Sequence, residues 1–218
     1  GIRLLLENPA MFKTQVRAIL KASINKNIKM MLPMVSTLKE IRESKKIIEE
    51  CKKELRSEKI KFDQDIEIGI MIEVPSAAVM ARDFSREVDF VSIGTNDLVQ
   101  YLMAVDRGND LVSALYQEFS PVVINTLKHI IDETKKSRKP VSLCGEMAAD
   151  TLAMPLLVGL GFDSLSMSPA TITYAKRIIR SCDYKKTKRL AAQCLKMQSE
   201  EEVKAAIEDF FNKNKITR

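Results

Sequence analysis

Apolar residues recur along this chain with two different periods. Two long stretches have apolar residues three or four positions apart, which predicts amphipathic helices over 9–22 and after Ser36, the expected helix cap. Shorter apolar runs that end at Pro, Gly or polar residues predict strands, and a helical pattern follows each run. Among these helical patterns, one covers 76–83 and another begins after Leu98. The five predicted strands are 28–34, 66–74, 88–93, 140–144 and 162–167.

This β–α alternation, with strands apolar on both faces, favours a parallel sheet. The residues singled out here lie at or just after the carboxyl ends of the predicted strands, and that edge carries the active site in a (β/α)8 TIM barrel. They are Met34, Glu73, Asn96, Asp97, Cys144 and Ser168. A complete barrel needs eight strands and about 250 residues. We therefore expect one partial barrel domain over residues 1–218, truncated at its N-terminal side, with a doubly wound sheet as the alternative.

Composition narrows the possible functions. The chain is 45% hydrophobic and 29% charged, with a net charge of +6, which is typical of a soluble globular protein. No run interleaves aromatic and basic residues, so nucleic acid is not an expected partner. The lysines lie in helical stretches, where they favour a solvated face, although an anionic substrate also fits the charge.

Cysteine usage and hydropathy indicate the compartment. Four scattered cysteines form no CxxC pair, and His129 is the one histidine, which argues against a zinc site. Free thiols suit a reducing compartment. With no signal peptide and no apolar run long enough to span a bilayer, the expectation is a cytoplasmic protein without membrane insertion.

Two carboxylates are candidate metal ligands. Glu73 ends the strand Ile-Gly-Ile-Met-Ile-Glu-Val, and Asp97 follows the next strand. Adjacent parallel strands lie roughly 5 Å apart, so both side chains can reach one cation. Two carboxylates completed by phosphate and water suit Mg²⁺. The alternative for Glu73 is a salt bridge to a neighbouring Lys or Arg.

Three further residues are candidates for ligand chemistry. Asn96 and Arg107 can donate to phosphate, although an arginine such as Arg107, taken alone, is more often a surface residue. Cys144 ends a strand and is either a small buried hydrophobe or a protonated acid. His129 lies inside a helical pattern away from the strand ends, so we expect a structural or surface role for it.

Five motifs in order carry a family resemblance: 72–78, 90–101, 104–109, 143–148 and 165–169. Their sequences are Ile-Glu-Val-Pro-Ser-Ala-Ala, Phe-Val-Ser-Ile-Gly-Thr-Asn-Asp-Leu-Val-Gln-Tyr, Ala-Val-Asp-Arg-Gly-Asn, Leu-Cys-Gly-Glu-Met-Ala and Leu-Ser-Met-Ser-Pro. Together they resemble the C-terminal phosphoenolpyruvate-binding domain of enzyme I of the bacterial sugar phosphotransferase system, the phosphoenolpyruvate–protein phosphotransferases. The dikinases and synthases that use phosphoenolpyruvate share part of this pattern and stay an alternative.

The resemblance implies roles for the candidate residues. Glu73 and Asp97 would bind Mg²⁺, Asn96 and Arg107 would hold the phosphate of phosphoenolpyruvate, and Cys144 would protonate the enolate to give pyruvate. Family members dimerise through this domain, so a homodimer is implied. A non-catalytic dimerisation module is a further alternative.

The resemblance also implies that some functional groups lie elsewhere. The family's phosphate acceptor is a histidine on a separate N-terminal domain, which passes phosphate to a histidine-containing phosphocarrier protein. Several anion-binding arginines would lie upstream of residue 1. We therefore expect this chain to bind phosphoenolpyruvate weakly and not to complete phosphotransfer alone.

Overall fold

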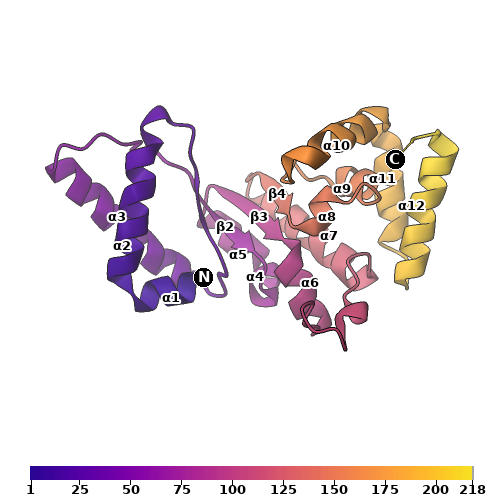
Figure 1. The fold of residues 1–218 in the computed structure, drawn as a ribbon, viewed down its shortest axis with the longest axis horizontal. Coiled ribbons are helices and arrows are strands. Elements are labelled where there is room, and N and C mark those ends of the chain that lie inside the picture. The colour runs from indigo at the N-terminus through magenta and orange to yellow at the C-terminus, as the bar shows by residue number, and fades with distance from the viewer. Residues whose placement is uncertain (218) are drawn as a thin grey trace.

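A five-stranded parallel sheet forms the centre of the molecule (Figure 1). The computed structural model describes residues 1–217. The strands are β1 (Met30–Leu32), β2 (Ile68–Ile72), β3 (Phe90–Gly94), β4 (Val141–Cys144) and β5 (Ser164–Leu165). All five predicted strands are confirmed, each within its predicted range or one residue beyond it.

The strand order decides between the two predicted folds. Neighbours in the sheet are consecutive in the chain, in the order β1–β2–β3–β4–β5, and every pair is parallel. A doubly wound sheet reverses its strand order at a switch point, and the described strands show no reversal. The sheet therefore progresses in one direction, as in an arc of a (β/α) barrel, and the doubly wound alternative is wrong.

Helices precede the sheet, connect its strands and follow it. Those that precede or connect strands are α1 (Ile2–Glu7), α2 (Pro9–Ala22), α3 (Leu38–Ser57), α4 (Pro75–Val79), α5 (Ala81–Arg86), α6 (Thr95–Met103), α7 (Pro121–Lys136), α8 (Glu146–Ala149) and α9 (Met154–Leu160). After β5 come α10 (Pro169–Ser181), α11 (Tyr184–Cys194) and α12 (Glu200–Asn214). Two 3₁₀ turns, η1 (Ser23–Asn25) and η2 (Ser113–Leu115), complete the set. In Figure 1, α1 to α3 lie at one end of the sheet and α9 to α12 at the other.

The long helix α3 starts one residue later than the sequence predicts. Thr37, not Ser36, is the N-cap: its hydroxyl accepts the Glu40 N–H at 3.3 Å, and the Glu40 carboxylate accepts the Thr37 N–H at 2.8 Å. This reciprocal pair is a capping box. Ser36 also donates its backbone N–H to Glu40, at 2.7 Å, so both residues serve the same helix start.

Two other helix boundaries differ from prediction. The stretch 76–83, expected as one helix, divides at Met80 into α4 and α5. Helix α6, expected after Leu98, begins at Thr95 directly after β3. The second difference matters for the site, because it places Asn96 and Asp97 in the first turn of a helix.

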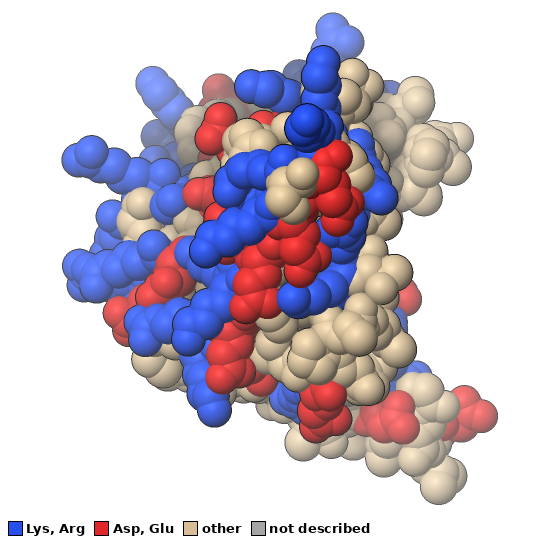
Figure 2. Space-filling view, turned by 90° about the vertical axis from the view of Figure 1, so that its left-hand side faces the viewer, with Lys and Arg blue, Asp and Glu red and all other residues tan. Residues whose placement is uncertain are grey.

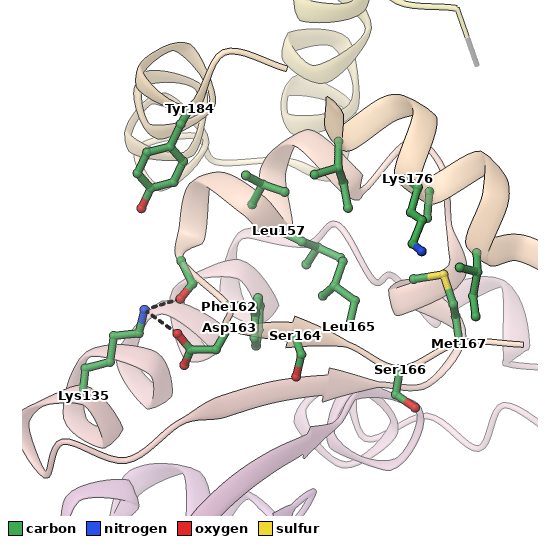
Figure 3. Close-up of a pocket in the computed structure, with 15 residues that line it drawn as sticks. Lys135, Leu157, Phe162, Asp163, Ser164, Leu165, Ser166, Met167, Lys176 and Tyr184 are labelled. Carbon is green, nitrogen blue, oxygen red and sulfur yellow. Dashed lines mark hydrogen bonds and ion pairs between the residues drawn. The ribbon is translucent and has the colours of Figure 1, made fainter. Parts of the chain in front are cut away.

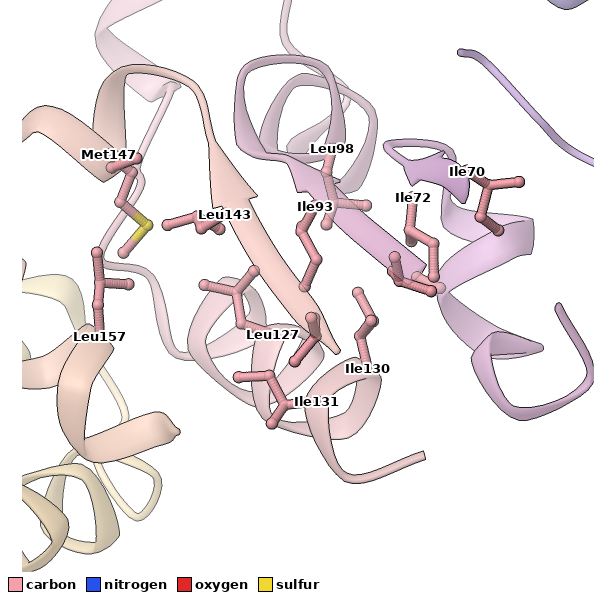
Figure 4. Close-up of a cluster of buried hydrophobic side chains, with 14 of the residues drawn as sticks. Ile70, Ile72, Ile93, Leu98, Leu127, Ile130, Ile131, Leu143, Met147 and Leu157 are labelled. Atoms are coloured by element: carbon pink, nitrogen blue, oxygen red, sulfur yellow. The ribbon is translucent and has the colours of Figure 1, made fainter. Parts of the chain in front are cut away.

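The core joins the sheet to the helices that connect its strands (Figure 4). Strand side chains such as Ile72, Ile93 and Leu143 pack with Leu127 and Ile130 of α7, and all are fully buried. Apolar burial of this kind is the main driving force for folding. The packed core fixes the carboxyl ends of β2, β3 and β4 relative to one another.

The charged face formed by α2 and α3 carries many of the lysines (Figure 2). Basic and acidic side chains interleave there, and Arg17 pairs with Glu54 at 3.0 Å and with Glu58 at 2.7 Å. This arrangement agrees with the predicted solvated helix face. Separately, none of the helices described within residues 1–217 is long and apolar enough to cross a membrane.

Candidate functional site

Two carboxylates meet at the carboxyl ends of β2 and β3. Glu73 directly follows β2 and is only 4% exposed, and its Oε1 accepts the backbone N–H of Met34 at 2.6 Å. Gly94 leaves room for it, because a Cβ there would lie 2.8 Å from Glu73 Oε2. Burial raises the pKa of Glu73, and the nearby carboxylate of Asp97 raises this pKa further. The hydrogen bond from the Met34 N–H acts in the opposite direction and lowers it.

This pair has the chemistry of a cation site. Glu73 is buried and interacts with Asp97, so the two carboxylates repel each other when both are ionised. A bound cation removes that repulsion. Among residues 1–217 no group of three or more Asp, Glu, His or Cys side chains could hold a metal. Two protein carboxylates with open positions suit Mg²⁺, which usually keeps waters and substrate oxygens as ligands.

Asn96 is held by the segment that follows β4. Its side-chain Oδ1 accepts the Glu146 N–H at 2.8 Å, and the neighbouring Thr95 hydroxyl donates to the Cys144 carbonyl at 2.9 Å. Because the Asn96 oxygen is engaged by a backbone N–H, the amide nitrogen is the part of the side chain left to donate. The first turn of α6 is thereby fixed to the end of β4.

Gly145 permits this close approach. Its φ of +103° lies in the region that favours glycine, and a Cβ there would lie 2.4 Å from Thr95 Oγ1 and 2.7 Å from Asn96 Oδ1. We expect Gly145→Ala to lower the free energy of unfolding by about 2 kcal/mol or more, from backbone strain plus overpacking. Chemical denaturation measures this. Gly108→Ala, in an exposed loop, is the control; equal stability of the two variants would contradict the expectation.

Cys144 is the last residue of β4 and its thiol lies between two groups of β3. The thiol donates to the Ile93 carbonyl at 3.4 Å and accepts from the Ser92 hydroxyl at 3.7 Å. Burial raises the pKa of Cys144, the Ser92 hydroxyl opposes this rise, and the charge of Glu73 adds to it. The thiol is therefore protonated at neutral pH, which is the form that an acid needs.

Arg107 lies in the loop after α6 and reaches the same edge of the sheet. Its Nη1 pairs with Glu146 Oε1 at 3.2 Å, and its backbone N–H donates to Gln100 Oε1 at 3.1 Å. Both Arg107 and Glu146 are exposed, so this pair is weak and a stronger anion can compete with it. No contact recorded for residues 1–217 joins Arg107 to Glu73 or Asp97.

Two residues near the site are absent from the sequence-based prediction. The Tyr116 hydroxyl donates to the carbonyl of Asn96 at 3.2 Å, and the Glu118 carboxylate accepts the N–H of Met147 in α8. Both lie in the irregular segment before α7, where no periodic pattern draws attention to them. The one signal available was a carboxylate flanked by aromatic residues in Tyr-Gln-Glu-Phe.

Other features of the molecule lie away from this site. A pocket of about 670 Å³ lies beside β5 among α9, α10 and the start of α11, with Lys135 pairing with Asp163 at its margin (Figure 3). None of the candidate residues lines it. His129 is on α7, with its Nε2 3.5 Å from the Val79 carbonyl, and no recorded contact connects it to Glu73, Asp97 or Cys144.

Known proteins match this chain along most of its length. Residues 1–184 match the family described as PEP-utilising enzyme, PEP-binding domain, where PEP is phosphoenolpyruvate. A phosphoenolpyruvate-protein phosphotransferase of Staphylococcus carnosus is 44% identical over 210 residues, covering 96% of this chain and 37% of the relative. A phosphoenolpyruvate-protein phosphotransferase of Enterococcus faecalis is 46% identical over 201 residues, covering 92% of this chain and 35% of the relative. The chain thus spans little more than a third of the relatives' length.

A solved structure agrees with the fold. A citrate lyase from Burkholderia xenovorans LB400 superposes with a TM-score of 0.56 at 15% identity, covering 94% of this chain and 70% of that one. At this identity the likeness concerns the fold alone. With a family match over residues 1–184, the chain belongs to the PEP-utilising enzymes and represents their PEP-binding domain.

Proposed function

We propose that this chain is the phosphoenolpyruvate-binding part of a phosphoenolpyruvate–protein phosphotransferase. In this role it binds phosphoenolpyruvate with Mg²⁺ and releases pyruvate after the phosphoryl group has passed to a histidine. The observation that carries the proposal is the placement of Glu73, Asp97 and Cys144 at the ends of three adjacent strands. The names of the S. carnosus and E. faecalis relatives favour a phosphotransferase over a dikinase or synthase.

Glu73 and Asp97 would hold Mg²⁺, which supplies charge neutralisation for the phosphate and the developing enolate oxygen. Phosphoryl transfer depends mainly on positioning and on such neutralisation. Asn96 would donate its amide N–H₂ to the phosphate, since its oxygen already accepts from Glu146. Arg107 would leave Glu146 and pair with a phosphate oxygen, where a guanidinium can bind in a bidentate way.

Cys144 would supply the proton that completes the reaction. When the P–O bond breaks, the phosphoryl group goes to the acceptor nitrogen, and the remaining enolate carries a negative charge. The thiol proton then passes to the methylene carbon, giving pyruvate and a thiolate. The Ser92 hydroxyl, 3.7 Å from the sulfur, would stabilise that thiolate until solvent returns a proton.

The partners of the site are also proposals. The acceptor histidine would belong to another domain. His129, the one histidine of the sequence, lies on α7 with its Nε2 3.5 Å from the Val79 carbonyl, and no contact within residues 1–217 joins it to Glu73, Asp97 or Cys144. From it the phosphate would pass to the histidine-containing phosphocarrier protein that supports sugar transport. A homodimer and a cytoplasmic location complete the proposal, and the four free thiols are compatible with a reducing compartment.

Isothermal titration calorimetry tests the proposed function directly. Phosphoenolpyruvate is titrated into the 218-residue chain with Mg²⁺ and again with EDTA, and we expect saturable binding in the first titration only. As the ligand control, 2-phosphoglycerate carries the same carboxylate and phosphate without the enol double bond, and it should bind more weakly. No Mg²⁺-dependent binding of phosphoenolpyruvate would refute the proposal.

A further inference from the structure

Glu118 is a half-buried acid that the proposed reaction does not use. It lies between η2 and α7, and its carboxylate accepts the N–H of Met147 in the first turn of α8. Its Oε1 is fully buried and has no hydrogen-bond partner among the described residues. A buried carboxylate oxygen without a partner is costly when the group is ionised.

The groups around Glu118 are mostly acidic. Glu146 and Asp150 flank it from the α8 segment, and Glu200 faces it from the start of α12. Burial is the main cause that raises the pKa of Glu118 to about 7, and the charges of these three carboxylates raise it further. The hydrogen bond from the Met147 N–H lowers this pKa and opposes part of the rise. The nearby cations are already engaged: Lys204 pairs with Glu200 at 3.1 Å and Arg107 with Glu146 at 3.2 Å.

The segment that carries Glu118 is tied to the candidate site at several points. Two residues earlier, the Tyr116 hydroxyl donates to the Asn96 carbonyl at 3.2 Å. One residue later, the Phe119 N–H donates to Glu200 Oε1 at 3.3 Å. Met147, which donates to Glu118, directly follows Glu146, the residue that holds Arg107. Glu118 therefore contacts the short helix whose first residue competes with phosphate for Arg107.

We propose that Glu118 is a positioning residue for phosphate binding, and that its charge state sets how firmly Glu146 holds Arg107. Ionised Glu118 adds a negative charge to the acidic group around Glu146, which strengthens the hold on Arg107 and repels an incoming phosphate. Protonated Glu118 removes that charge and frees Arg107 for the ligand. This inference rests on the proposed function, because it assigns Arg107 to the phosphate.

The expected result is a pH-dependent affinity that one substitution removes. We expect the affinity of the unmodified chain for phosphoenolpyruvate with Mg²⁺ to fall between pH 6 and pH 8. The fall should be about 3- to 10-fold larger than the fall measured for Glu118→Gln. This is the size expected for the interaction with one additional charge that solvent partly screens. Glu118→Gln keeps the shape and the acceptor for Met147. Titration of the ligand's own phosphate is common to both proteins and cancels in the ratio.

The matched control is Glu201→Gln, which removes the same charge from an exposed carboxylate at the start of α12. Its pH dependence should equal that of the unmodified chain. If Glu118→Gln keeps the full pH dependence, or if Glu201→Gln loses as much of it, the role assigned to Glu118 is wrong.

A measurement without ligand separates this inference from the proposed function. In ¹⁵N-resolved NMR spectra, the Met147 amide and the Arg107 side-chain N–H should shift together with a midpoint near pH 7, and should not do so in Glu118→Gln. A Met147 amide without this titration overturns the inference, whether or not phosphoenolpyruvate binds. Absence of phosphoenolpyruvate binding at every pH counts instead against the proposed function.

Discussion

Asp97→Asn is expected to leave the fold intact and to weaken Mg²⁺-dependent binding of phosphoenolpyruvate by more than about 100-fold. Loss of a group that only hydrogen-bonds to a metal ligand already lowers metal affinity by roughly 10- to 100-fold, and loss of a ligand should cost more. The substitution keeps the shape of the side chain in the first turn of α6 and removes the negative charge. It also removes the carboxylate that raises the pKa of Glu73. Calorimetry with Mg²⁺ and phosphoenolpyruvate measures the loss.

The matched control for this substitution is Asp132→Asn. Asp132 is an exposed carboxylate on α7 that pairs with Lys128, and it has no recorded contact with the site. Its variant should bind as the unmodified chain does. Undiminished Mg²⁺-dependent binding by Asp97→Asn, with normal thermal stability, would remove Asp97 from the metal site. If Glu73→Ala/Asp97→Ala also gave unchanged heats, only a non-catalytic dimerisation module would be left.

Loss of the Cys144 thiol is expected to slow proton transfer at the methyl carbon of pyruvate by about 10²- to 10⁴-fold, the usual contribution of a positioned acid or base. Proton delivery to the enolate and proton removal from pyruvate are the two directions of one step. Exchange of pyruvate methyl protons in D₂O with Mg²⁺ therefore reports on Cys144 without any phosphate acceptor. Proton NMR follows the disappearance of the methyl signal.

Cys182→Ala is the control for Cys144→Ala. Cys182 is a half-buried free thiol that follows α10, and no recorded contact joins it to the strand ends. Its variant should exchange at the rate of the unmodified chain. Equal exchange rates for Cys144→Ala and the unmodified chain would show that another group moves the proton.

The sequence contained enough information to place the sheet and most of the site. Runs that are apolar on both faces had to be parallel strands, and parallel strands bring their carboxyl ends to one edge. That reasoning predicts Glu73, Asp97 and Cys144 at adjacent strand ends, where the structure has them. It needs only the period of the pattern and the chain order of the strands.

The sequence could not predict which side chains pair at that edge. Arg107 pairs with Glu146, 39 residues away, because the loop after α6 folds back toward α8. The same fold brings Glu118 to Met147. Such contacts depend on the path of irregular segments, which no periodicity specifies. The sequence does not predict the start of α6 at Thr95, because the glycine and the polar residues after β3 resemble a turn.

The order of the strands has a consequence for how the site comes into being during folding. Glu73, Asp97 and Cys144 come from three successive strands, and 47 positions separate the last two. Parallel pairing over such separations is slow, because loop closure must precede the contacts that reward it. A ligand that bridges these strand ends binds only after β2, β3 and β4 are in register. Its binding energy therefore adds directly to the stability of that register, and hydrogen exchange in β3 should slow when Mg²⁺ and phosphoenolpyruvate are present.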